Sequence, residues 1–311
     1  MGHDGRSMRI LLTGASGSIG AALAPALVRA GHELRGFGRD PARVPATLPF
    51  VRGDAISGAG LDEALEGIEV AYYLIHSMEG GGRAGFEDNE RAAAENFVVA
   101  AQRAGVRRVV YLGGLVPQER ALSRHLRSRL EVEQILLAGL PEAVALRASI
   151  VIGARSRSFR FLVHLVERMK VLALPPWREY RTQPIDVRDV GAYLVAAAAT
   201  PRAPGGLSLD IAGPDALSYG QMIERIAGLM LVRRRSFRFG ANATPIVAPI
   251  AAALAGEEAG FIGPLMESLS GDLLPRDERA PALFGVRLHR FDRAVERALR
   301  DWESREPLAA R

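Results

Sequence analysis

The stretch RILLTGASGSIG, residues Arg9–Gly20, joins a short apolar run to the start of a helical pattern through three glycines. Gly14, Gly17 and Gly20 follow one another at three-residue spacing, which between a strand and a helix is typical of a loop that binds the pyrophosphate of a dinucleotide. Gly14 permits the tight turn, Gly17 lets the backbone approach the pyrophosphate, and Gly20 lets the helix lie close on the strand. A tight turn without a ligand is the alternative. The dinucleotide contacts expected from this loop are Gly14, Ser16, Gly17, Ser18, Ile19 and Gly20.

The following sequence alternates between strand and helix patterns. Short apolar runs rich in β-branched residues occupy residues 32–39, 48–54, 70–77, 107–115 and 142–153, and stretches with helical spacing separate them. Strands that alternate with helices form parallel crossover units. The sequence therefore predicts an α/β fold with a doubly wound parallel sheet, the Rossmann fold.

The regular alternation of strand and helix patterns ends after Gly153, where proline, glycine and aromatic residues become frequent. We expect a dinucleotide-binding Rossmann domain over residues 8–153, to which a helix at 187–200 returns. A smaller, irregular α+β C-terminal region, over residues 154–186 and 205–311, is expected to hold the substrate.

Composition excludes several classes of protein. The 311 residues are 48% hydrophobic, enough for a large core, and contain no cysteine, so disulfides, thiolate nucleophiles and Cys-ligated metals are absent. The net charge of +5 comes from scattered arginines, which does not favour nucleic-acid binding. The most apolar late segment, 241–255, is broken by Pro245 and Pro249 and is too short for a membrane span. We expect a cytoplasmic monomer or homodimer without a metal site.

The end of the second predicted strand bears on the choice of dinucleotide. NAD sites commonly end this strand in an acidic residue that binds the ribose 2′-hydroxyl, whereas this strand ends in Gly38, Arg39 and Asp40. Arg39 can form a bidentate contact with a 2′-phosphate, and Asp40 can cap the following segment, so NADP is favoured over NAD. Asp54, after the third strand, either accepts from the adenine amino group or forms an Asx-turn.

Several motifs together resemble one family. The glycine loop, Arg39, RGDA with Asp54, YYLIHSM, VVYLGGL, LSRHLRSRLEVE, LRASIVIG and QPIDVRDV resemble the atypical short-chain dehydrogenase/reductases, in the branch whose strand-five motif reads Leu-Gly-Gly-Leu. The resemblance covers most of the chain from Met8 and implies a Rossmann fold that binds NAD(P)H. Members of the family include reductases, epimerases, a nitrogen-repression sensor that binds dinucleotide without turnover, and an accessory subunit of respiratory complex I.

The chain departs from the active-enzyme pattern of that family. Active members have Ser or Thr after strand five and a Tyr-x-x-x-Lys pair on the next helix. Here Gly113 or Gly114 takes the Ser position, and the lone lysine, Lys170, follows Val166 at the required offset. The tyrosine–lysine mechanism is therefore absent.

His125 and Arg129 are candidates for the missing pair, because a spacing of four residues puts them on one face of a helix. If this helix is the family's catalytic helix, His125 takes the Tyr position and Arg129 the Lys position. His125 would then donate a proton, with turnover falling as the pH rises past about 6.5, and Arg129 would hold the ribose. A surface helix with a histidine and several arginines is the alternative.

The remaining candidates follow later strands. His76 and Ser77, after the fourth strand, and Gly113 are expected to border the dinucleotide. The substrate lining expected after Gly153 is Phe159, Trp177, Tyr180 and Gln183, with ordinary packing as the alternative. The sequence predicts an NADP(H)-dependent oxidoreductase that acts on a small organic carbonyl or enone. The alternative is a non-catalytic NAD(P)H-binding sensor or assembly protein.

Overall fold

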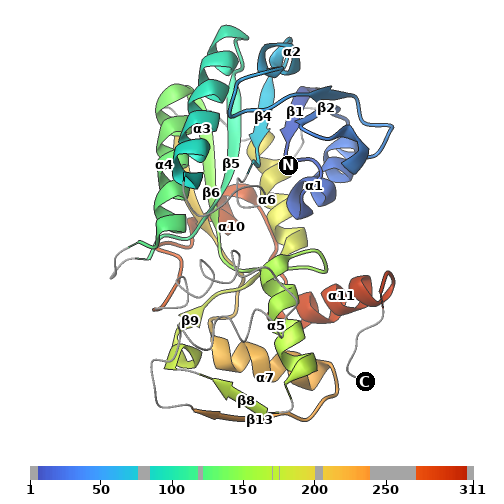
Figure 1. Cartoon of the computed structure of the whole chain (residues 1–311), viewed down its shortest axis with the longest axis vertical. Helices are drawn as coiled ribbons and strands as arrows, with labels where there is room; N and C mark the ends of the chain where they lie inside the picture. The colour runs from blue at the N-terminus through green and yellow to red at the C-terminus, as the bar shows by residue number, and fades with distance from the viewer. Residues whose placement is uncertain are drawn as a thin grey trace.

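A seven-stranded parallel sheet forms the upper lobe of the computed structural model (Figure 1), which describes residues 6–75, 85–117, 122–169, 171–174, 176–199, 206–238 and 271–306. Its spatial order is β11-β6-β5-β4-β1-β2-β3, and every neighbouring pair is parallel. The order reverses at β1, as in a doubly wound dinucleotide-binding fold, so the predicted fold class is confirmed. The strands are β1 (Arg9–Thr13), β2 (Glu33–Gly38), β3 (Phe50–Arg52), β4 (Val70–Tyr73), β5 (Arg108–Gly114), β6 (Glu142–Ala148) and β11 (Leu207–Ile211).

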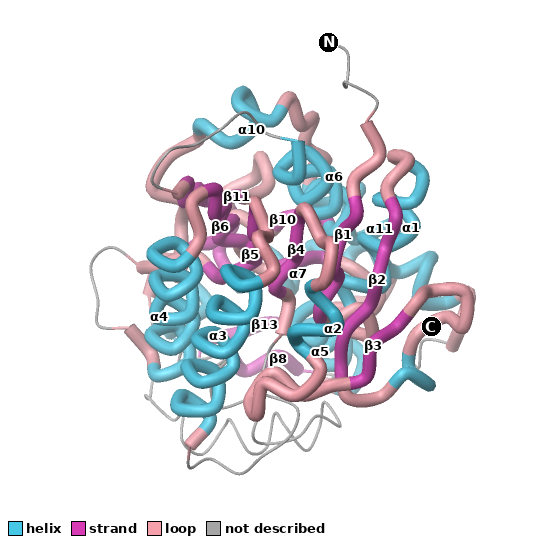
Figure 2. The backbone as a smooth tube through the Cα atoms, turned by 90° about the horizontal axis from the view of Figure 1, so that it is seen from above, coloured by secondary structure: helices cyan, strands magenta, loops and turns pink. Residues whose placement is uncertain are grey.

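Helices cover both faces of this sheet (Figure 2) because successive strand side chains point to opposite faces. Ile10 and Leu12 of β1 pack in the core beneath one set of helices, and Leu11 packs in the core beneath the other. The first set is α1 (Ser18–Arg29), α6 (Val187–Ala199) and α10 (Arg279–Phe284). The second set is α2 (Leu61–Leu65), α3 (Phe86–Arg103) and α4 (Arg124–Gly139).

Residues 207–211 differ from their expected place. The sequence predicts them in the substrate region, but they form β11, which pairs with β6 at the edge of the main sheet. Leu209 and Ile211 are buried in the core beneath α6, which explains why the strand adds to the sheet. The boundary between the two regions is therefore interleaved along the chain.

The lower lobe has a core of its own (Figure 1). Three amphipathic helices surround it: α5 (Arg157–Arg168), α7 (Tyr219–Leu229) and α11 (Phe291–Glu303). Ser218 caps α7 in a reciprocal arrangement with Gln221, which satisfies two backbone donors at the helix start. Short strand pairs complete the lobe: β7 (Val151–Ile152) with β10 (Ile185–Asp186), β9 (Arg181–Thr182) with β12 (Leu217–Ser218), and β8 (Val171–Leu174) with β13 (Arg235–Arg238).

Among the described residues, no helix combines the length and the apolar character needed to cross a bilayer. The apolar segment 241–255 lies outside the described residues.

Candidate cofactor and active site

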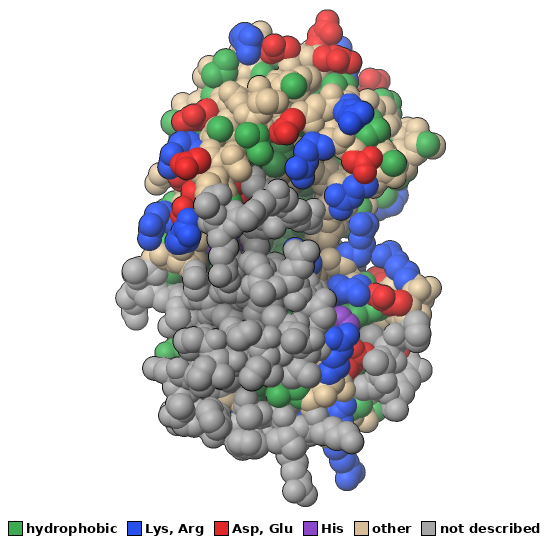
Figure 3. All heavy atoms as spheres, viewed as in Figure 1, with side chains coloured by type: hydrophobic (Ala, Val, Ile, Leu, Met, Phe, Trp, Pro, Cys, Tyr) green, Lys and Arg blue, Asp and Glu red, His purple; other side chains and the backbone are tan. Residues whose placement is uncertain are grey.

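A cavity of about 860 Å³ opens where the carboxyl ends of β1, β4, β5 and β6 face the start of α5. Ligands of open α/β sheets bind in this crevice, and the volume is within the range of small-molecule sites. Arginine side chains gather on the visible surface near the waist between the two lobes (Figure 3). Six of the residues that line the cavity itself are arginines, which favours a negatively charged ligand there.

At two of its three glycines the loop has room for backbone only. Gly14 has a φ of +67°, and a Cβ there would lie 2.5 Å from the carbonyl oxygen of Leu74. A Cβ on Gly20 would lie 2.3 Å from the carbonyl oxygen of Gly14, so α1 approaches the loop as closely as a glycine allows. Gly17 is exposed at the mouth of the cavity. Each glycine thus meets the requirement expected of it in a pyrophosphate-binding loop.

Thr13 holds this loop against the neighbouring strand. Its hydroxyl donates to the carbonyl of Tyr72 at 2.9 Å and accepts from the N–H of Leu74 at 2.9 Å. Thr13 was not predicted as a site residue, since a threonine at a strand end carries no ligand signature. The contact fixes the ends of β1 and β4 side by side at the cavity.

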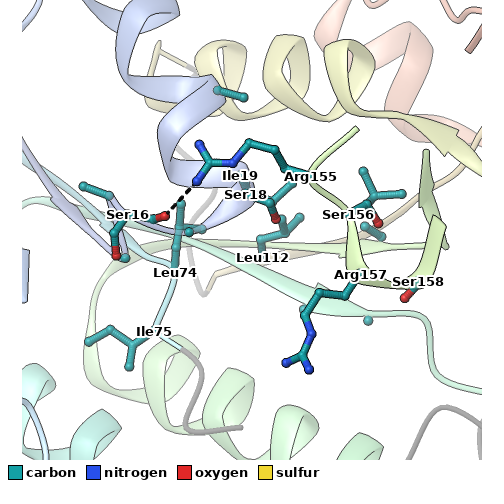
Figure 4. Close-up of a pocket in the computed structure, with 18 of the residues that line it drawn as sticks. Ser16, Ser18, Ile19, Leu74, Ile75, Leu112, Arg155, Ser156, Arg157 and Ser158 are labelled. Atoms are coloured by element: carbon teal, nitrogen blue, oxygen red, sulfur yellow. Dashed lines mark hydrogen bonds between the residues drawn. The ribbon is translucent and has the colours of Figure 1, made fainter. Parts of the chain in front are cut away.

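The start of α1 offers donors for an anion. Gly17 is its N-cap and makes no side-chain cap, and the first turn contains no acidic residue. Ser16, Ser18 and Ile19 line the cavity at this point (Figure 4). Free N–H groups and the helix dipole both favour a phosphate here, so the residues present fit a dinucleotide.

The adenosine end is expected near the end of β2. Arg39 lines the cavity there, and so does Arg43, which was not predicted from the sequence. Asp40 accepts from the N–H of Ala42 at 3.0 Å and caps the short helical turn η1 (Pro41–Arg43). Two arginines therefore line this end of the cavity.

Asp54 fits both alternatives that the sequence left open. Its Oδ1 accepts from the N–H of Ile56 at 2.9 Å, which is an Asx-turn, and the residue also lines the cavity. The side-chain amide of Asn96 donates to the carbonyl of Ile56 at 2.8 Å and supports the turn from α3. Asp54 is therefore held in place at the wall where an adenine is expected.

The structure brings His125 and Arg129 into the same cavity as the glycine loop. Both lie on α4, which begins after the N-cap Ser123. Gly113 and Gly114 line the cavity from the end of β5. The predicted catalytic pair and the predicted dinucleotide loop thus share one site.

Tyr111 explains why position 113 is a glycine. A Cβ on Gly113 would lie 2.9 Å from Cε1 of the Tyr111 ring, whereas a Cβ on Gly114 would come no closer than 3.5 Å to Leu126. Tyr111 is buried, and its hydroxyl donates to the carbonyl of Arg129 at 3.1 Å. Burial, the largest cause, raises the pKa of Tyr111 to about 12, so this phenol stays protonated.

His125 is neutral in this environment. Burial, followed by the nearby guanidinium of Arg129, lowers the pKa of His125 from 6.5 to about 3. Its Nδ1 is buried and finds no hydrogen-bond partner in the described part of the chain. The structure therefore differs from the expectation that turnover reports a histidine pKa near 6.5, because the imidazole is already desolvated beside a cation.

We expect His125 to make the protein acid-sensitive. Below pH 6.5 the unfolded chain binds a proton at this position that the folded chain does not bind until about pH 3, so the free energy of unfolding falls as the pH falls through this window. The slope for one proton is at most about 1.4 kcal/mol per pH unit. Urea unfolding of the wild type and His125→Phe at pH 4–8 measures it. Equal slopes for the two proteins would contradict a depressed pKa.

The predicted substrate residues lie elsewhere. Phe159 is 0% exposed and Trp177 7% exposed, both in the core of the lower lobe, where Trp177 packs edge-on against Tyr219. Tyr180 packs against the same core, and the amide of Gln183 donates to the carbonyl of Gly213 at 3.1 Å. These contacts fit the alternative, ordinary packing, and for Phe159 the reason is that α5 buries its apolar face. His76 and Ser77 lie outside the described residues.

Other residues line the cavity that were not predicted from the sequence. Phe86 and Asn89 come from the start of α3, whose position beside the cavity is set by tertiary packing. Arg155, Ser156, Arg157 and Ser158 precede or begin α5, and Leu273 comes from a segment far along the chain. Among the described residues, no group of three or more His, Asp or Glu side chains converges as a metal site would.

Comparison with known proteins agrees with this site. Residues 14–149 match the family model described as NAD(P)H-binding. A 3-beta-hydroxysteroid dehydrogenase from Mycolicibacterium neoaurum is 37% identical over 113 residues, 33% of this chain and 31% of that protein. The mitochondrial NADH dehydrogenase (ubiquinone) 1 alpha subcomplex subunit 9 of Arabidopsis thaliana is 29% identical over 140 residues, 45% of this chain and 35% of that protein. The match thus spans about a third of the length of these relatives.

A solved structure extends the likeness to the whole fold. The UDP-glucuronic acid 4-epimerase from Bacillus cereus, in complex with NAD, matches with a TM-score of 0.73 at 18% identity, over 96% of this chain and 100% of that chain. The likeness therefore includes the lower lobe as well as the sheet. Residues 14–149 are thus similar to an NAD(P)H-binding domain.

Proposed function

We propose that the protein is an NADP(H)-dependent oxidoreductase that reduces a small organic carbonyl or enone in this cavity. The observation that carries the proposal is the placement of His125 and Arg129 in the same cavity as the glycine loop. An imidazole and a guanidinium beside a nicotinamide can stabilise the charge that develops on a reduced carbonyl.

The residues that would hold the cofactor lie along one wall. The glycine loop and the first turn of α1 would bind the pyrophosphate, and Asp54 would accept from the adenine. Arg39, with Arg43 beside it, would bind a 2′-phosphate, whereas Asp40 is engaged as a helix cap. These features support NADP over NAD.

The chemistry needs a donor at the carbonyl oxygen. When bound, NADPH supplies a hydride to the substrate carbon. Neutral His125 donates a hydrogen bond to the oxygen, and the positive charge of Arg129 stabilises the negative charge that forms there. The oxygen then takes its proton from water. A neutral imidazole acts here as an electrophile, so His125 need not titrate near neutral pH.

A second function is dinucleotide binding without turnover. Two observations favour it: the tyrosine–lysine pair is missing from the sequence, and the chain resembles a subunit of NADH dehydrogenase. In this case His125 would serve only to pack against the bound nucleotide.

Turnover separates the two functions. The purified protein would first be assayed for co-purified nucleotide, and NADPH absorbance would then be followed with ketones, enones and quinones. Oxidation of NADPH that requires both the protein and an added substrate supports the oxidoreductase. Tight NADPH binding with no turnover of any compound favours the second function.

We expect Arg39→Ala to weaken NADPH selectively. A hydrogen bond to a charged group contributes about 1.5–3 kcal/mol, so the NADPH dissociation constant should rise at least tenfold while that of NADH hardly changes. Isothermal titration calorimetry with both nucleotides measures the difference. Arg43→Ala should act in the same direction. Equal losses for NADPH and NADH would show that Arg39 does not bind the 2′-phosphate.

A further inference from the structure

Arg155 reaches across the cavity from the lower lobe to the glycine loop. It lies in the turn between β7 and α5, and its Nη2 donates to the carbonyl oxygen of Ser16 at 3.3 Å (Figure 4). Ser16 lies between Gly14 and Gly17, directly before α1. The guanidinium therefore lies at the point where the pyrophosphate of a dinucleotide is expected.

The charges around Arg155 favour an anion. Within the described part of the chain no acidic side chain pairs with Arg155, and its one hydrogen bond goes to a carbonyl. A guanidinium has five N–H donors, so further donors remain for a ligand. The neighbouring start of α1 is itself positive and has no acidic residue in its first turn. Two positive groups facing each other are stabilised when an anion binds between them.

Arg157 provides a contrast within the same wall. It lies two residues later, yet its side chain extends away from Ser16 in the close-up, whereas that of Arg155 extends over the first turn of α1 (Figure 4). The direction of the side chain, not the number of arginines nearby, thus singles out Arg155.

We propose that Arg155 binds the pyrophosphate of the bound dinucleotide from the side opposite the glycine loop and so links the lower lobe to the occupied cofactor site. The inference rests on the proposed cofactor function. Arg155 would contact the part common to NADPH and NADH, so it contributes affinity without selectivity. Arg39 would contribute selectivity.

The test compares three probes on matched variants by titration calorimetry. Arg155→Ala is expected to weaken NADPH and NADH by the same factor, about tenfold to a hundredfold for one charge-assisted contact. Binding of adenosine 2′-monophosphate, which has no pyrophosphate, should be unchanged. Arg155→Lys keeps the charge but loses the planar fork and should fall between Arg155→Ala and the wild type.

The control is Arg293→Ala, which removes an exposed arginine of α11 that pairs with Glu296 outside the cavity. It should bind all three probes as the wild type does. Because Arg155 is exposed, thermal unfolding without nucleotide should be the same for Arg155→Ala and the wild type.

Each outcome decides one point. Unchanged dinucleotide affinity in Arg155→Ala overturns the inference and leaves the proposed function standing. A loss for NADPH alone also overturns it, because Arg155 would then bind the 2′-phosphate. If dinucleotide binding depends on Arg155 but the protein oxidises NADPH with none of the added substrates, the inference is supported and the proposed oxidoreductase function is overturned. A wild type that binds neither dinucleotide overturns both.

Discussion

Replacement of Gly17 by valine is expected to abolish dinucleotide binding while the chain still folds. Gly17 has a φ of −70° and a ψ of 169°, which any residue can adopt, and it is exposed at the mouth of the cavity. A Cβ would lie 3.2 Å from the carbonyl oxygen of Gly14, a contact that a small shift relieves. The isopropyl group would instead occupy the approach of the pyrophosphate. NADPH and NADH should both bind at least about a hundredfold more weakly, a loss of roughly 2.7 kcal/mol or more.

The neighbouring glycines are unsuitable for this test. A side chain at Gly20 would meet the Gly14 carbonyl at 2.3 Å, so the loss of binding would include the loss of the fold. Gly228→Ala in α7 is a matched control, because its Cβ would meet no atom within 4 Å. It should stabilise the chain by about 0.5–1 kcal/mol and leave nucleotide binding unchanged. Gly17→Val with wild-type affinity for NADPH would show that the pyrophosphate binds elsewhere.

The glycine loop could be predicted because its chemistry is local. Strand, turn and helix follow each other within Arg9–Gly20. The spacing of three glycines there directly indicates a tight turn that a ligand and a helix can approach closely. The shared face of His125 and Arg129 was predictable for the same reason, since helix geometry relates residues four apart. The elements that this helix faces depend on tertiary packing, so they could be identified only from the structure.

Arg43, Arg155 and Leu273 could not be assigned from the sequence. Arg43 lines the cavity from a short helical turn that Asp40 caps, and Arg155 reaches the glycine loop because the lower lobe packs opposite it. Leu273 reaches the cavity through its backbone bond to the carbonyl of Arg181 at 2.8 Å. Such contacts depend on which distant segments meet, and no spacing rule encodes that.

Phe159 lies in the lower core, although an aromatic residue so near the predicted site suggests contact with a substrate. The helical period of α5 is the stronger signal, since Leu162, Val163 and Val166 follow Phe159 at helical spacing and are buried around the same lower core. This period predicts that the Phe159 ring faces the lower core. The polar residues 155–158, which precede it, line the cavity. Periodicity should therefore outweigh residue type when a helix borders a predicted site.

Replacement of His125 by phenylalanine is expected to lower turnover by about 10²–10³-fold, the effect of removing one donor to a developing oxyanion. NADPH should bind to the wild type and to His125→Phe with the same affinity, because the imidazole contacts the reacting oxygen and not the phosphates. Arg129→Ala should lower turnover and also weaken cofactor binding, since Arg129 would both stabilise the charge on the oxygen and hold the ribose. His125→Gln keeps an N–H donor and should recover part of the rate.

The pH profile distinguishes a neutral donor from a protonated one. With its pKa lowered to about 3 by burial and by Arg129, His125 keeps the same protonation state from pH 5 to pH 8, so it should contribute no inflection in kcat over that range. Stopped-flow measurement of NADPH oxidation with a confirmed substrate, for the wild type and His125→Phe, tests both statements. An inflection near pH 6.5 that His125→Phe removes would show that the bound nucleotide restores an imidazolium. A wild-type rate in His125→Phe would exclude His125 from the chemistry, because phenylalanine cannot donate a hydrogen bond to the substrate oxygen.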